Sequence, residues 1–259
     1  MKKALIVIVL LLLIVAGGVY YFLTNLDSLV KAAIEKYGSE VTQTAVRVDR
    51  VKIDLTQGTG GIYGLTVANP GGFDAKQAFA LGETSVKINL KSIGEEVIVI
   101  DAITVRAPKV MYEMNAAREG SLNKLYDNIS KSIPAGSKAS KEEAAHAGPK
   151  LIIRKLVFEK GAVDARLVPL DGKTYSVKLP ELNMANLGAP NGATGSALAK
   201  EILGRITKSA QEEVKRQVID KQLKSAVEAE RKKLESEAQK RIEEEKKKLD
   251  PRLQDLLKR

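Results

Sequence analysis

The chain contains no cysteine and no tryptophan, and His146 is its only histidine. Without cysteine, neither a disulfide framework nor a lipid-modified cysteine is possible. His146 lies in a stretch without apolar periodicity, and the chain has no HExxH or comparable spacing of metal ligands. The pairs Glu95-Glu96 and Glu142-Glu143 do not suggest an acid and a base acting together, because adjacent strand residues point to opposite faces. We therefore predict no enzyme activity, no catalytic residues, no metal site and no cofactor.

The chain carries an excess of positive charge but no basic cluster. Its 42 Lys and Arg residues outnumber 32 Asp and Glu residues, and the two signs are interspersed. Nucleic-acid-binding proteins usually cluster their cations and interleave aromatic residues, whereas aromatic residues make up only 4% of this chain. We predict no nucleic-acid partner and a solvated surface near anionic lipid headgroups.

The longest apolar run extends from Ala4 to Leu23. At about 1.5 Å per helical residue it covers the roughly 30 Å hydrocarbon core of a bilayer, which predicts a transmembrane anchor over residues 1–24. A cleaved signal peptide is the alternative, because Val15-Ala16-Gly17 suits a signal peptidase. The apolar residues after it, including Tyr20 and Tyr21, favour the anchor. The short Lys2-Lys3 head favours a bacterial inner-membrane protein with most of the chain in the periplasm.

Periodicity predicts an α+β fold in three parts after the anchor. Residues 25–38 read as an amphipathic juxtamembrane helix that begins at Asn25 and ends at Gly38. Residues 39–192 alternate with period two and predict an antiparallel amphipathic sheet of about eight strands joined by short turns, including one at Lys160-Gly161. A flexible insertion over residues 131–150 interrupts this β-domain. Residues 193–259 predict a long charged helix.

The long helix has an apolar stripe that continues, less regularly, to Leu249. Its repeat is not a strict heptad, and its second half has too little apolar surface for a core helix. We predict that residues 197–249 bind further copies of this chain or another envelope protein.

The segment "GIYGLTVANPGGF" joins a period-two strand to a turn. Proline cannot donate to a β-ladder, and glycine tolerates the backbone angles of tight turns. The predicted structural residues are Gly64, Asn69, Pro70, Gly71, Gly72 and Phe73.

In its order of elements the chain resembles the N-terminal module of AsmA-like proteins. The resemblance is carried by "VDRVKIDLTQGTGGIYGLTVANPGGF", "LGETSVKINLKSI", "GSLNKLYDNI" and "LIIRKLVFEKGAVDARL", and it covers about residues 1 to 205. It implies an inner-membrane anchor, a periplasmic location and an apolar β-groove that carries phospholipid. The chain departs from the large family members in having few predicted strands and a long charged helix.

One face of the predicted sheet is apolar, and its partner decides the function. The candidate lipid-facing residues are Val86, Ile88, Leu90, Ile98 and Ile100. In one interpretation this face binds membrane lipid, which predicts lipid binding or support of lipid transport and membrane organisation. In the other, a helix covers the face as an ordinary core, and the protein is a scaffold that oligomerises through its C-terminal helix.

Overall fold

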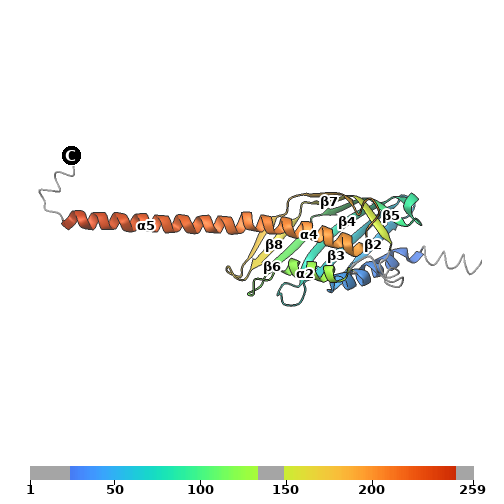
Figure 1. Ribbon diagram of the computed structural model, residues 1–259, viewed down its shortest axis with the longest axis horizontal. Helices are drawn as coiled ribbons and strands as arrows, with labels where there is room; N and C mark the ends of the chain where they lie inside the picture. The colour runs from blue at the N-terminus through green and yellow to red at the C-terminus, as the bar shows by residue number, and fades with distance from the viewer. Residues whose placement is uncertain (1–23, 134–148, 249–259) are drawn as a thin grey trace, which may run out of the picture. The chain divides into compact units, whose positions relative to one another are not determined.

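A computed structural model describes residues 24–133 and 149–248 (Figure 1). The predicted anchor over residues 1–24, apart from Thr24, and most of the predicted insertion therefore lie outside the described residues. Across the two described stretches, no helix is both long and apolar enough to cross a membrane. The chain divides into two compact units, Met1–Glu213 and Val214–Arg259.

The described part of the first unit begins with a helix over residues 24–42. Its strands are β1 (Val46–Arg47), β2 (Arg50–Asp54), β3 (Thr59–Ala68), β4 (Gln77–Ile88), β5 (Val97–Arg106), β6 (Lys109–Met114), β7 (Lys150–Glu159), β8 (Ala162–Leu167), β9 (Thr174–Lys178) and β10 (Leu182–Leu187). Its other helices are the short 3-10 helix η1 (Leu90–Ser92), α2 (Ser121–Lys131) and α4 (Gly195–Val214). The α+β class and the long C-terminal helix are confirmed.

The strands form one ten-stranded sheet with the order β10-β7-β5-β4-β6-β8-β9, and β3 joins β4 to β1 and β2. The prediction of an antiparallel sheet of about eight strands was wrong, because β5 pairs with β7 and β6 with β8 in parallel. The chain runs through α2 between β6 and β7, so it re-enters the sheet in its earlier direction. At Lys160-Gly161 it bends without reversing, whereas we predicted a hairpin there.

A line of bends crosses the whole sheet. On one side of this line, register aligns Val46, Val67, Phe79, Val110, Val163 and Val177. On the other side it aligns Val51, Ile62, Thr84, Val105, Phe158 and Leu182. In every strand row the two aligned residues are five positions apart, so neighbouring rows keep the same register across the line. An odd spacing would reverse the two faces of a regular strand, and the shared bend lets apolar residues stay on one face on both sides of it.

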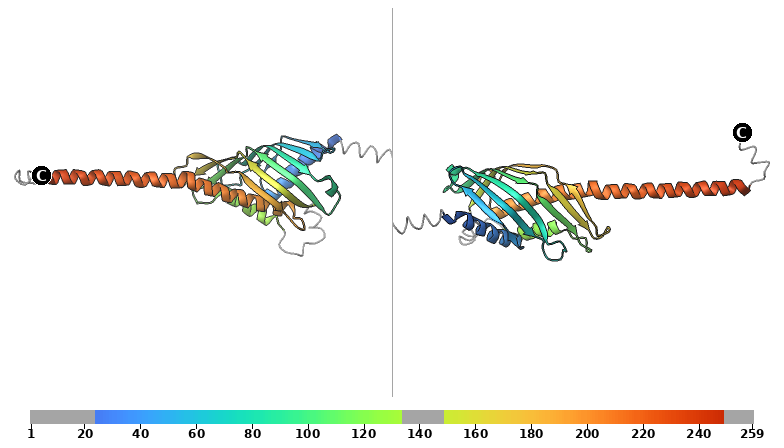
Figure 2. Two further views of the ribbon diagram at one scale, coloured as in Figure 1. Left: turned by 90° about the horizontal axis from the view of Figure 1, so that it is seen from above. Right: turned by 180° about the vertical axis from the view of Figure 1, so that it is seen from behind.

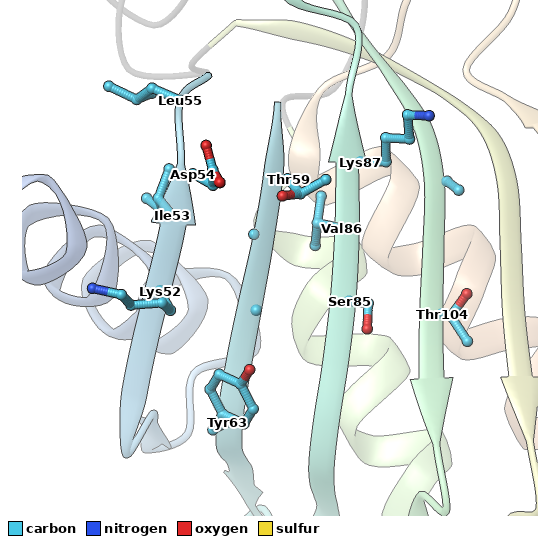
Figure 3. Close-up of a pocket in the computed structure, with 13 residues that line it drawn as sticks. Lys52, Ile53, Asp54, Leu55, Thr59, Tyr63, Ser85, Val86, Lys87 and Thr104 are labelled. Atoms are coloured by element: carbon cyan, nitrogen blue, oxygen red, sulfur yellow. The ribbon is translucent and has the colours of Figure 1, made fainter. Parts of the chain in front are cut away.

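Two helices lie on that face of the sheet, which we call the inner face (Figures 1 and 3). In α2, Leu122 and Leu125 are completely buried. The helix α4 approaches α2 closely, since a Cβ atom on Gly204 would lie 3.3 Å from the Tyr126 ring. The side chain of Tyr112 on β6 is also buried, and this burial raises its pKa. The core therefore sits between the sheet and these helices.

The helix over residues 24–42 covers the free edge of β1 and β2 (Figure 2). Carboxylates of Asp27 and Glu35 accept hydrogen bonds from the backbone N–H groups of Ile53 and Val48, each at 2.9 Å. The hydroxyl of Ser39 accepts a third one from Val46, also at 2.9 Å. Asp27, Glu35 and Ser39 are separated by multiples of four residues, so their side chains share one helix face. A polar stripe thus satisfies an edge strand that would otherwise be open to unwanted pairing.

The sequence prediction had the limits of this helix wrong. Asn25 lies inside it, and the helix continues through Gly38 to residue 42. A Cβ atom on Gly38 would lie 3.1 Å from Val46 Cγ1, so this glycine lets the helix approach the strand and does not end it.

Replacing both carboxylates, Asp27→Ala and Glu35→Ala, should expose this edge. We expect a loss of about 2 kcal/mol of stability and at least a roughly tenfold faster hydrogen exchange of the Val48 and Ile53 amides. Hydrogen-exchange mass spectrometry of the strand peptide measures the effect. Glu40→Ala, at an exposed position of the same helix, serves as the control; equal exchange in both variants would rule out edge protection.

The described part of the second unit contains a π-helical segment, η2 (Lys215–Ile219), and α5 (Asp220–Lys248). Four large apolar side chains of α5, from Leu223, Val227, Leu234 and Ile242, are more than half exposed. They occupy the predicted apolar stripe. Within the described part of the chain nothing covers them.

Candidate functional site

The inner face of the sheet is covered unevenly. One ladder of aligned residues consists of Ile53, Gly60, Val86, Ile103, Leu156 and Met184. Leu156 and Met184 at one side of the sheet are buried, whereas Val86 and Ile103 are only half-buried. The next ladder repeats the gradient, with half-buried Ile88 and Ile100 and buried Ile153 and Leu187.

The half-buried part forms what we call the apolar strip, on β4 and β5. It consists of Val86, Ile88, Ile98, Ile100 and Ile103. Every residue of β3 and almost every residue of β5 is half-buried, whereas β8 alternates between buried and half-buried residues. Neither face of β3 and β5 is therefore fully covered, which is unusual for a strand as rich in Val and Ile as β5.

Four of the five candidate lipid-facing residues lie together on this strip, namely Val86, Ile88, Ile98 and Ile100. Leu90 does not. The strand β4 ends at Ile88, and Asn89 caps η1, accepting a hydrogen bond from the Lys91 N–H through its side chain. Leu90 instead lies at the end of the sheet, where a Cβ atom on Gly58 would come within 2.9 Å of its Cγ.

A hollow of about 740 Å³ lies mainly on the opposite face (Figure 3). Gly61, Ser85 and Thr104 align across its floor. The ring of Tyr63 lies over Gly61, where a Cβ atom would be 2.7 Å from the phenol oxygen. Small side chains make this depression, and its rim bears both charges: Lys52, Lys87 and Asp54. Hydrogen bonds from Thr56 and Gln57 hold the pKa of Asp54 below its usual value.

Of the predicted structural residues, those from Asn69 to Phe73 lie between β3 and β4, with a turn at Gly71-Gly72, whereas Gly64 lies within β3 at φ +62. A Cβ atom on Gly64 would collide with the side chain of Asp49. Within the turn, Pro70 is buried and the Asn69 side chain donates to the Ala75 carbonyl at 2.8 Å. The turn is therefore structural.

A buried carboxylate, which the sequence analysis missed, holds this turn against β6. Glu113 is 1% exposed, and its two oxygens accept hydrogen bonds from the Asp74 and Ala75 N–H groups at 3.0 and 2.9 Å. Arg166, its register partner on β8, lies 3.4 Å from the same carboxylate and also pairs with Asp74. The hydrogen bond with Asp74 raises the pKa of Arg166 above its usual value.

Glu113 was missed because it lies at a position that alternates with the apolar residues of its strand. The sequence pattern assigns such positions to the solvent-exposed face. Only the returning turn buries it. A Glu with no neighbouring cation in sequence gives no signal for this contact.

The apolar strip and the hollow on the opposite face are surfaces suited to binding. Within the described residues, no group of three or more His, Asp or Glu side chains is placed to hold a metal ion. No family model matches the chain, and no curated protein sequence matches it.

Proposed function

We propose that this chain is a membrane-anchored envelope protein that binds lipid acyl chains on the apolar strip. It would thereby support lipid transport or membrane organisation in the periplasm, as the resemblance to AsmA-like proteins implies. The supporting observation is the half-buried state of the strip. Apolar strand residues that a globular protein would normally cover remain accessible here.

The decisive residue is Ile88, in the half-buried part of its ladder. Ile88→Asp places a carboxylate where acyl chains would lie, and binding there would require removing that charge from water. We expect phospholipid that co-purifies with the full chain to fall at least about fivefold, because a loss near 1 kcal/mol already changes occupancy by that factor. Lipid extraction and native mass spectrometry measure it.

Ser85→Asp is the matched control, since it adds the same charge on the opposite face of the same strand. It should keep its lipid. A melting curve identifies the competing case: if Ile88→Asp unfolds the domain, the strip is ordinary core. Wild-type protein without lipid would also overturn the proposal.

The exposed apolar residues of α5 favour a second candidate function. Large apolar side chains on an otherwise charged helix are typical of helix association. In this alternative the chain is a scaffold that oligomerises, or binds an envelope partner, through residues 197–249 and carries no lipid.

A further inference from the structure

We propose that one end of the sheet docks on the membrane surface by inserting three apolar side chains. The inference rests on the proposed membrane anchoring but not on lipid binding by the apolar strip. The three residues are Leu55, Leu90 and Ile93, which we call the apolar tips; they are 45%, 41% and 55% exposed.

The apolar tips lie at a single end of the sheet. Leu55 follows the last residue of β2, while Leu90 and Ile93 follow the last residue of β4. The two connections touch: the Ile88 N–H donates to the Gly58 carbonyl at 2.8 Å, and Leu90 lies over Gly58.

The connection after β4 is also fixed internally. The Ser92 hydroxyl accepts a hydrogen bond from the Val99 N–H at 2.9 Å, and the Asn89 N–H donates to the Val99 carbonyl at the same distance. The exposed side chains are therefore held on ordered backbone, and inserting them sacrifices little conformational entropy.

The beginning of the described chain lies at this same end (Figure 1). Thr24 is the first described residue, and three positions later Asp27 accepts its hydrogen bond from Ile53 near the end of β2. The apolar run of residues 4–23 directly precedes Thr24 in the sequence. A bilayer holding that run would lie next to the apolar tips, which argues for lipid as their partner.

Charge at this end favours apolar insertion over electrostatic attraction. Lys52 is paired with Asp27 at 3.4 Å, and Lys150 with Glu96 at 2.8 Å. Lys87 and Lys91 near this end are matched in number by Asp54 and Glu95, so little net charge remains to attract anionic lipid. Three partly exposed side chains bind weakly alone, but an anchor would hold them near the bilayer at an effective concentration on the order of millimolar.

The position of the apolar tips also determines which end of the apolar strip would face the membrane. Ile88, Ile98 and Ile100 are the strip residues nearest this end, because β4 ends and β5 begins there. Docking would therefore place the end of the strip against the acyl chains of the membrane, with no water-filled gap to cross.

The absence of tryptophan permits a direct test with single-tryptophan variants of the full chain. Ile93→Trp reports on the apolar tips. Leu170→Trp is the matched control, because Leu170 is similarly exposed (46%) but lies between β8 and β9 at the other end of the sheet. Both proteins are reconstituted into phosphatidylcholine vesicles, with or without bromine on the acyl chains.

We expect brominated lipid to reduce the emission of Ile93→Trp by about threefold, as for an interfacial tryptophan, and to leave Leu170→Trp unchanged. Adding Leu55→Asp and Leu90→Asp to Ile93→Trp should abolish the quenching. Raising the salt to roughly 0.5 M should not.

The outcomes separate the two proposals. Protein that does not float with the vesicles would overturn the anchoring, and docking with it. Protein that floats while Ile93→Trp stays unquenched would overturn docking alone, as would equal quenching of both tryptophans.

Discussion

Glu113→Leu should lower the stability of the first unit by about 2 to 5 kcal/mol, since each N–H group left without an acceptor at this buried site costs about 1 to 3 kcal/mol. Two backbone N–H groups, of Asp74 and Ala75, would lose their acceptor, and Arg166 would keep only Asp74 as an ionic partner. For a unit of this size the melting temperature should fall by roughly 10 to 15 °C. Since domains are typically stable by about 5 to 15 kcal/mol, this is a large fraction of the total.

Glu83→Leu provides the comparison, because Glu83 faces Arg106 at 3.9 Å on the surface. Exposed pairs of this kind contribute about 0 to 1 kcal/mol. Thermal melts followed by circular dichroism distinguish the two sites. Similar shifts for both variants would mean that Glu113 does not hold the turn against β6.

Two C-terminal truncations should differ in their effect on stability. A chain that ends at Gly204 lacks Ile206 and Ala210, both buried in α4, and loss of such side chains costs several kcal/mol. We expect it to lose cooperative melting. A chain that ends at Ile219 retains all of α4 and should melt close to the full chain.

The chain that ends at Ile219 also tests the scaffold alternative. It removes α5 and its exposed apolar residues, so a scaffold should dissociate to monomers in sedimentation velocity experiments. If lipid stays bound while oligomers disappear, the two functions belong to different units. Oligomers that persist without α5 would contradict association through that helix.

Local patterns in the sequence identified most elements. Period-two alternation located the strands from Val46 to Asn186, and spacing of about four located α4, because both patterns follow from the geometry of the isolated element. Four of the five candidate lipid-facing residues fall on one face for the same reason.

The errors concern glycines and long-range contacts. Gly161 and Gly38 were interpreted as chain reversal and helix end, yet one serves a bend and the other a close helix-strand contact. A glycine permits all of these, and only the partner segment decides among them. The parallel pairing of β5 with β7 likewise depends on how the chain returns after α2, which no local pattern records.

The line of bends fixes the number of residues that each strand row of this sheet must have. Each strand row has the same number of residues across the bend, so the inward-facing phase changes at the same point in every row. Removing a single residue from one row, for example Gly161, would turn the following segment inside out relative to its neighbours. These short irregular sites resemble loops, which usually accept changes in length. The sites along the bend should not tolerate insertions or deletions, since a change in one row would require the same change in every other row.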